Sequence, residues 1–245
     1  VCQGERFQQF ETGHGTIGHS LFDYGSRLLG RSTVYYELWD NMRAIDYLAT
    51  REECDSQNGV GVTGTSGGGT QSLFLGAYDR RTYVASPSCF VETIQTKLEG
   101  RMRSGVADGC QHIADEGLYH LDHADYLMMR YPQPTQILAA EHDMFDIRAT
   151  RYAAKEVEAF YSRMGKKDRF EYFESPTGHG YTPPHQLAGT RWMRKWLLSR
   201  SNRLSNDRSI PLLEQEQTYV TKSGQILREY PDERTLADLN LELAM

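Results

Sequence analysis

Cysteine is scarce in the 245-residue sequence: the chain has four cysteines, and no two of them form a CxxC pair. A structural zinc site built from paired cysteines is therefore not expected. Four cysteines in a chain of this length also do not indicate a disulfide scaffold. Cys89 and Cys110 could pair with each other, and the sequence leaves that question open.

Long apolar runs are lacking as well. No segment approaches the roughly 18 residues that a membrane span needs, so we expect no membrane partner. The first residues also lack the charged start and apolar stretch of a signal peptide. The chain begins at Val1 rather than at Met, which predicts that residues upstream were removed or omitted.

An excess of positive charge is also absent. The chain has 27 Lys and Arg against 33 Asp and Glu, which gives a net charge of −6. A protein that binds nucleic acid needs clustered Lys and Arg to neutralise phosphates. Here these residues are spread through segments of helical character, such as 148–167, where a solvated face is expected. We therefore predict no nucleic-acid partner.

The sequence does contain an alternation of helix and strand patterns from about residue 33 onward. Apolar residues at helical spacing predict helices over 33–49, 67–78, 147–164 and 186–198. Short β-rich runs predict strands over 59–64, 82–86, 135–141 and 169–174. Repeated strand–helix alternation predicts an α/β fold, in which a parallel sheet is covered by helices on both faces.

The remaining segments lie outside this alternation. Residues 89–131 have weak periodicity and many charges, which predicts an inserted excursion with short helices. We also expect a polar linker over 201–209, a hairpin over 217–229 that turns at residues 222–224, and a short helix over 235–245. These patterns predict a main domain over 1–200 and a linker with a C-terminal extension over 201–245.

One motif carries chemistry. Residues 64–68 read Gly-Thr-Ser-Gly-Gly, which fits G-x-S-x-G, with a predicted strand before it and a predicted helix after it. A nucleophile at the tip of such a turn has a strained backbone that exposes its Oγ, and small neighbours at Gly64 and Gly68 allow the strand and the helix to approach. The N–H of Gly67 can then donate to an oxyanion. We therefore predict Ser66 as a nucleophile.

A serine hydroxyl needs a base, and the base needs an orienting acid. On this kind of fold the acid follows a later strand and the histidine follows the last one. Asp143 comes directly after the strand predicted over 135–141, and His179 comes just past the strand predicted over 169–174. Asp146 and Glu141 are the alternatives for the acid, although Asp146 is better placed to cap the following helix.

Three rival motifs point to other chemistry. Gly59, Gly61 and Gly64 match G-x-G-x-x-G, but the glycines lie within a predicted strand and the expected later acid is missing. A phosphate loop would need a Lys where the chain has Thr70 and Gln71. The polar segment 120–125 contains His120, Asp122, His123 and Asp125. A hydrogen-bonded loop is favoured there over a metal site.

With these residues placed, the sequence resembles an α/β-hydrolase of the acetyl xylan esterase-like branch of the carbohydrate esterases, near the dienelactone hydrolase group. The resemblance covers roughly residues 1–200. It rests on segments 28–48, 59–79, 137–146 (ILAAEHDMFD) and 175–181 (SPTGHGY). It implies the same triad of Ser66, Asp143 and His179, with no cofactor and no metal.

The resemblance also implies a substrate and a chain context. A short acyl ester on a carbohydrate is expected, with acetyl favoured. Residues 4–6 are similar to the turn after the fold's fourth strand, which implies that the first strands and the second oxyanion donor are not in this chain and that further domains or chains complete the fold. Residues near the motif ends that could touch a sugar are Arg31, Trp39, Glu92, His142 and Tyr181.

Two other functions stay open at this stage. A peptidase of the prolyl oligopeptidase type shares the serine turn and the order of the three triad residues. A hydrolase-like domain without activity could instead serve as a scaffold or a carbohydrate-binding module.

Overall fold

The computed structural model describes residues 4–6, 16–55, 59–99, 108–199 and 211–245. The chain divides into two compact units. Unit 1 comprises the described residues of Val1–Glu37, Ala107–Asp115 and Ser205–Met245, and unit 2 comprises those of Leu38–Val106 and Glu116–Leu204. None of the described helices is both long and apolar enough to cross a membrane.

Unit 2 is built on a sheet of four parallel strands in the order β1-β2-β3-β4. The strands are β1 (Val60–Thr65), β2 (Thr82–Ser88), β3 (Thr135–His142) and β4 (Phe170–Gly178). The four strands predicted from the sequence are confirmed, with ends that differ by a few residues. Since all strands run the same way, their carboxyl ends meet at one edge of the sheet.

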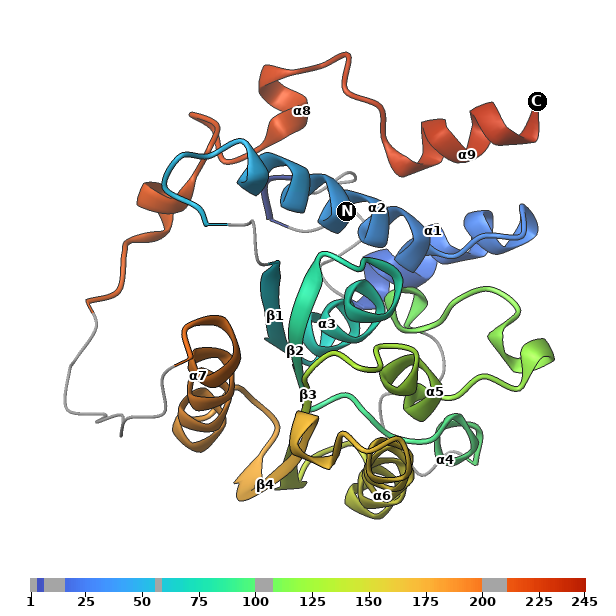
Figure 1. Ribbon diagram of the computed structural model, residues 1–245. Coiled ribbons are helices and arrows are strands. Elements are labelled where there is room, and N and C mark those ends of the chain that lie inside the picture. Colours follow the sequence, from blue (N-terminus) through green and yellow to red (C-terminus); the bar gives the residue numbers. More distant parts are fainter. Residues whose placement is uncertain (1–3, 7–15, 56–58, 100–107, 200–210) are drawn as a thin grey trace. The chain divides into compact units, whose positions relative to one another are not determined.

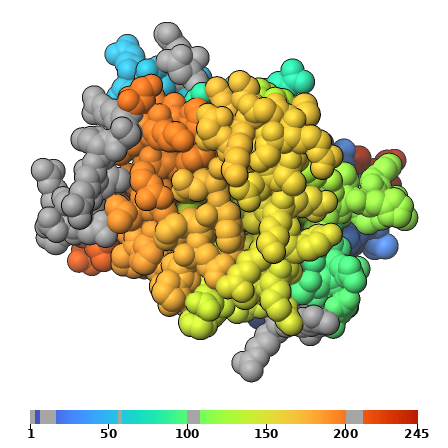
Figure 2. All heavy atoms as spheres, turned by 60° about the horizontal axis from the view of Figure 1, so that its bottom comes forward, coloured from blue at the N-terminus to red at the C-terminus, as the bar shows by residue number. Residues whose placement is uncertain are grey.

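Helices cover both faces of this sheet (Figure 1). Two of them, α3 (Gly67–Tyr78) and α6 (Ile147–Arg163), pack on β1–β2 and on β3–β4 respectively, and α5 (His123–Met128) packs against both helices. On the other face, α7 (Pro183–Leu197) contacts all four strands. Figure 2 views the surface formed by β4, α6 and α7, coloured yellow to orange. The predicted α/β architecture is therefore confirmed.

The described residues of the excursion between β2 and β3 form only short elements, as its weak periodicity predicts. In unit 2 these are α4 (Ile94–Leu98), η3 (Glu116–Tyr119) and α5, and the short 3-10 helix η4 (Lys167–Arg169) precedes β4. The core of the unit is formed by strand and helix residues that are almost completely buried: Leu73, Phe74, Val84, Ile137 and Val157. Each such side chain contributes about 1.5–3 kcal/mol on burial.

One charged residue lies inside this core. Arg130 is 3% exposed, and its guanidinium donates to the carbonyl oxygens of Gly76 and Pro134 and to Oγ1 of Thr135 at 2.7, 3.3 and 2.9 Å. Burial lowers the pKa of Arg130 to about 10. Since these bonds join α3 to the start of β3, we assign Arg130 a structural role.

Unit 1 contains helices from both ends of the chain. They are η1 (Gly4–Arg6), α1 (Thr16–Leu28), η2 (Gly109–Gln111), η5 (Gln215–Thr218), α8 (Ile226–Glu229), α9 (Leu236–Ala244) and the first turn of α2 (Thr33–Ala49). Phe22, Tyr36 and Leu236 form a small apolar cluster. Beside it, the hydroxyl of Tyr36 donates to Oδ1 of Asn240 at 2.8 Å.

The hairpin predicted over 217–229 is wrong, because this segment holds the helices η5 and α8. Gln225 caps α8 by accepting from the N–H of Leu227, and the carboxylate of Glu5 accepts from the N–H groups of Val220 and Thr221. These side chains satisfy backbone donors that a hairpin would pair across its strands. The helix predicted over 235–245 is confirmed as α9. The linker predicted over 201–209 lies outside the described residues.

Candidate active site

Ser66 occupies the turn between β1 and α3. Its backbone has φ 58° and ψ −119°, a left-handed conformation that is costly for any residue with a Cβ. Two backbone hydrogen bonds hold it: the N–H of Ser66 donates to the carbonyl of Ser88 at 3.0 Å, and its own carbonyl accepts from Thr70 at 2.9 Å. Strain of this kind persists only where the surroundings enforce it, and it is typical of a nucleophile turn.

The glycines of the motif allow the turn to form. A Cβ on Gly64 would lie 2.7 Å from the carbonyl carbon of Gly68, so β1 and α3 could not approach as they do. A Cβ on Gly69 would overlap the carbonyl oxygen of Ser88. A Cβ on Gly68 itself would meet nothing within 4 Å. The need for a small residue is therefore confirmed at Gly64, whereas the second essential glycine is Gly69 rather than Gly68.

Asp143 and His179 meet at the same edge of the sheet. Oδ1 of Asp143 lies 2.8 Å from Nδ1 of His179, and it also accepts from the N–H of Phe145 at 3.2 Å. The Asp143 side chain is 3% exposed and that of His179 is 25% exposed. A buried acid thus orients an imidazole that solvent and substrate can reach, as acid–base chemistry requires.

The electrostatics of this pair favour the ionised acid. Burial raises the pKa of Asp143, but hydrogen bonds from His179 and from the Cys89 thiol outweigh it, and the pKa is lowered overall. The hydrogen bond to Asp143 raises the pKa of His179, burial opposes this, and the negative charge of Asp143 adds to the rise. The pair therefore stabilises the imidazolium that forms when His179 accepts a proton.

The sheet register places the nucleophile turn and this pair at the same carboxyl edge of the sheet. Thr65 pairs with Ser88 across β1 and β2, and His142 pairs with Gly178 across β3 and β4. Among the described residues no hydrogen bond joins the Ser66 hydroxyl to His179. Catalytic hydrogen bonds are often long without substrate and shorten in the reacting complex, so this geometry is compatible with a triad.

Gly67 is the first residue of α3, so its N–H belongs to the group of helix-start donors that have no acceptor within the helix. Such donors bind negative charge. The position agrees with the oxyanion role predicted for Gly67.

The thiol of Cys89 is a neighbour of the pair that the sequence pattern did not identify. Cys89 follows the last residue of β2, has φ 51° and is 3% exposed. Its Sγ lies 3.7 Å from the carbonyl oxygen of Gly180, and burial raises its pKa. The rule that placed Asp143, a polar residue directly after a parallel strand, would also have found Cys89. Cys89 and Cys110 do not form a disulfide with each other.

The two alternative acids have other positions. Asp146 caps α6, because its Oδ1 accepts from the N–H of Arg148 at 2.9 Å. This confirms the capping role expected for it. Glu141 is an exposed residue of β3.

Tyr181 joins the loop that carries His179 to β1, the strand that precedes Ser66. Its hydroxyl lies 3.1 Å from Oγ1 of Thr63 on β1, and Thr63 in turn donates to the carbonyl of Ser86. A hydroxyl engaged in this way positions the loop that carries His179. Contact of Tyr181 with a sugar stays a prediction.

The other residues expected near a sugar lie in varied surroundings. Trp39 is 55% exposed, and the guanidinium of Arg43 lies 4.5 Å from its ring centre. His142 is exposed at the end of β3. In unit 1, the guanidinium of Arg31 lies 4.5 Å from the ring centre of Tyr35. The two cation–π contacts stabilise the surface of the protein whether or not a sugar binds there.

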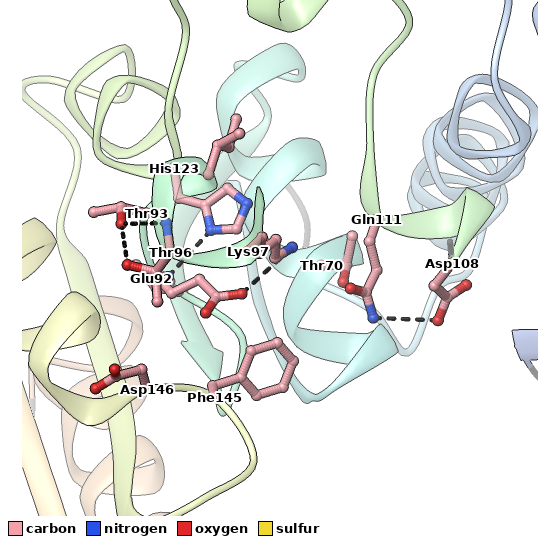
Figure 3. Close-up of polar contacts among 12 residues, drawn as sticks. Thr70, Glu92, Thr93, Thr96, Lys97, Asp108, Gln111, His123, Phe145 and Asp146 are labelled. Carbon is pink, nitrogen blue, oxygen red and sulfur yellow. Dashed lines mark hydrogen bonds and ion pairs between the residues drawn. The ribbon is translucent and has the colours of Figure 1, made fainter. Parts of the chain in front are cut away.

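Glu92 has a buried environment. It is completely buried, its Oε1 lies 3.7 Å from Nζ of the equally buried Lys97, and its N–H donates to Nδ1 of His123 at 3.1 Å (Figure 3). Burial raises the pKa of Glu92 to about 8, although the charge of Lys97 opposes the shift. A residue enclosed in this way supports the fold, and we do not retain it as a sugar contact.

The polar segment 120–125 is a helix start. Asp122 caps α5 and forms a capping box with Asp125, while the ring of His123 stacks near that of Phe90. These contacts use three of the four side chains that had suggested a metal site, which supports a hydrogen-bonded loop.

An open groove of about 740 Å³ lies between the excursion and α6. Its lining includes five carboxylates, from Glu99, Asp122, Asp125, Asp146 and Glu156. Asp146 follows the candidate acid Asp143 by three residues, so the groove begins close to the site. The excursion thus contributes a polar wall beside the strand ends.

Comparison with known proteins finds similarity to solved structures. No family model and no curated protein sequence matches the chain. Among solved structures, the chain is similar to a glucuronoyl esterase from Solibacter usitatus, with 16% identity and a TM-score of 0.56 over 67% of this chain and 49% of that one. It is also similar to a methylesterase, with 17% identity and a TM-score of 0.51 over 67% and 36%.

A third similar structure is a glucuronoyl esterase variant from Sporotrichum thermophile in complex with methyl 4-O-methyl-β-D-glucopyranuronate. Here the identity is 12% and the TM-score 0.56, over 76% of this chain and 57% of that one. The chain thus spans 36% to 57% of the length of these three structures. Together with the parallel sheet, they show that the chain has the α/β-hydrolase fold.

Proposed function

We propose that this protein is a serine carboxylester hydrolase that acts on a carbohydrate ester through an acyl-enzyme. The observation that carries the proposal is the 2.8 Å hydrogen bond between buried Asp143 and partly exposed His179, at the sheet edge where Ser66 has a strained turn. The fold, and the esterase names of the similar structures, support the same reading.

The reaction has two stages. Oγ of Ser66 attacks the ester carbonyl while Nε2 of His179 takes its proton, and the N–H of Gly67 donates to the oxyanion. The alcohol leaves with that proton, which gives an acyl-enzyme at Ser66. Water then attacks the acyl group while His179 again takes a proton, and the acid is released. Asp143 stays ionised throughout, which its lowered pKa favours.

Two ester types fit this chemistry. An acetylated sugar carries the carbohydrate on the alcohol side of the ester, and the sequence resemblance favours this substrate. A uronic acid ester carries the carbohydrate on the acid side, as in the methyl glucuronate bound by one similar structure. The proposal retains acetyl as the first choice on the strength of that resemblance.

Fluorophosphonate labelling tests the proposal, since the probe forms a covalent bond only with an activated serine. We expect labelling of the wild type and none of Ser66→Ala, with Ser72→Ala as a control because its hydroxyl bonds to the carbonyl of Gly68 within α3. No labelling of the wild type would favour a scaffold or binding domain.

Substrate comparison separates the remaining candidates. We expect a higher kcat/KM for p-nitrophenyl acetate and for acetylated xylan than for methyl glucuronate. The reverse order of kcat/KM would indicate that the natural substrate is a uronic acid ester. Cleavage of proline-linked peptides without ester cleavage would assign a peptidase.

A further inference from the structure

Unit 1 contains a buried cluster of potential metal ligands. His19 lies on α1, Glu37 in the first turns of α2 and Cys110 on η2, and they are 5%, 8% and 2% exposed. One ligand atom from each residue lies within 4.8 Å of the others. Three segments that are far apart in the sequence thus bring an imidazole, a carboxylate and a thiol to one place.

The imidazole of His19 is the unusual member. Within the described residues neither ring nitrogen has a hydrogen-bond partner at ordinary length, although both are buried. The nearest acceptors are Oε1 of Glu37, 3.7 Å from Nε2, and Oδ1 of Asp108, 3.5 Å from Nδ1. Hydrogen bonds of this type are normally about 2.7–3.2 Å long. A buried polar atom without a partner is costly, so this gap indicates that something lies between the groups.

The separations agree with a coordination sphere. Zinc binds nitrogen and oxygen at about 2.0–2.2 Å and sulfur at about 2.3 Å, so neighbouring ligand atoms of a tetrahedral site lie about 3.3–3.6 Å apart. The 3.7 Å between His19 and Glu37 is close to this range. One imidazole, one carboxylate and one thiolate form a donor set of intermediate softness, which suits zinc better than magnesium or calcium.

We propose that unit 1 binds a zinc-type divalent metal ion through Nε2 of His19, a carboxylate oxygen of Glu37 and Sγ of Cys110. A water molecule completes the four ligands. When the metal binds, the thiol proton of Cys110 leaves to solvent and the sulfur lone pair forms the metal bond. Asp108 then accepts from the Nδ1–H of His19, as an outer carboxylate commonly does for a ligating histidine.

A proton is the competing occupant of the same place. Burial lowers the pKa of His19. The hydrogen-bonding interaction with Asp108 and the charge of Glu37 raise it by more, so the pKa is raised overall. An imidazolium between two carboxylates would therefore also be stable. The two occupants differ in the role of Cys110. With a proton there, its thiol keeps the hydrogen bond that it donates to Oδ1 of Asp108 at 3.2 Å, whereas a metal ion needs its sulfur as a thiolate ligand.

Metal content distinguishes them. Purified protein is incubated with zinc sulfate, desalted and measured by inductively coupled plasma mass spectrometry. We expect about one zinc ion per chain in the wild type and at least about tenfold less in His19→Gln and Cys110→Ser. Cys54→Ser is the matched control and should keep its zinc. A wild type without zinc would overturn the proposal.

A second group of potential ligands, formed by Cys89, Asp143 and His179 of unit 2, needs its own control. Cys89→Ser should retain zinc. Loss of zinc in this variant, with retention in Cys110→Ser, would move the metal to the candidate active site and overturn the assignment to unit 1.

Cobalt loading covers the case in which Cys110→Ser fails to fold. In the Cys89→Ser background, bound Co²⁺ should show a thiolate charge-transfer band in the near ultraviolet, and absence of this band overturns the proposal. Asp108→Asn keeps all three ligands and should weaken affinity about 10- to 100-fold. Zinc content and fluorophosphonate labelling of Ser66 are separate readouts, so either proposal can fail without the other.

Discussion

The hydroxyl of Tyr181 lies 3.1 Å from Oγ1 of Thr63 and thereby joins the loop after β4 to the strand before Ser66. His179 lies two residues before Tyr181, and Ser66 three residues after Thr63. This bond therefore helps to set the distance between base and nucleophile, although neither of its partners takes part in the chemistry.

Tyr181→Phe removes this bond and keeps the ring. We expect the free energy of unfolding to fall by about 1 kcal/mol, and kcat to fall about tenfold with little change in KM, because misplacement of the base affects the transition state most. Thr63→Val should lower kcat by a similar factor but lower the free energy of unfolding further, because it also removes the bond to the carbonyl of Ser86. The double variant should be no worse than Thr63→Val. Additive effects would show that the bond is unimportant. Tyr152→Phe, at an exposed position, is the control.

Ser66→Ala should lower kcat by about 10⁴-fold or more, since the nucleophile is lost. Ser66→Gly should be equally inactive but more stable than the wild type by about 1 kcal/mol, because glycine adopts φ 58° without strain. Urea denaturation and turnover of p-nitrophenyl acetate measure the two effects. Near-normal turnover by Ser66→Ala would rule out the proposed nucleophile.

The acid limb of the pH–rate profile should lie above the ordinary imidazole value of 6.5. His179 acts as a base only when neutral, and its hydrogen bond with Asp143 raises its pKa, so kcat/KM should fall as pH drops through this raised value. In Asp143→Asn the limb should move to lower pH, with kcat lower by about 10⁴-fold. A limb that stays in place would assign the titration to another group.

Glu92 should make folding stability depend on pH. Burial raises its pKa from 4.5 to about 8. Between these values the folded protein binds a proton that the unfolded chain has lost, so the free energy of unfolding falls as pH rises, by at most about 1.4 kcal/mol per pH unit. Urea denaturation at several pH values should show a flatter profile for Glu92→Gln. Glu99→Gln, at an exposed position, should leave the profile unchanged.

Arg130→Met should destabilise the protein by about 3–5 kcal/mol, because the carbonyl of Gly76 and the hydroxyl of Thr135 would lose their bonds to the buried guanidinium. The carbonyl of Pro134 would lose the same donor and keep the N–H of Ala85. Arg130→Lys should recover little of this loss, since an ammonium cannot reproduce the guanidinium fork. Arg148→Met, on an exposed side chain, is the control. Equal thermal unfolding temperatures for Arg130→Met and Arg148→Met would contradict the structural role assigned to Arg130.

The sequence by itself determined the sheet and the positions of the candidate site. Periodicity and turn residues are local, so they identified the strands and the long helices. The order of elements along the chain placed Ser66, Asp143 and His179 after the first, third and fourth of these strands. It also identified the capping role of Asp146. The hairpin expected at 217–229 failed because Glu5, more than 200 residues away, binds the backbone there.

Only the tertiary structure decided which side chains meet across long separations. Burial of Glu92 with Lys97, the thiol of Cys89 beside Asp143 and the gathering of His19, Glu37 and Cys110 depend on contacts between distant segments. No local pattern encodes such contacts, because each residue has an ordinary place in its own helix or strand. Their chemistry arises when packing removes water and brings charges and donors within a few ångströms of one another.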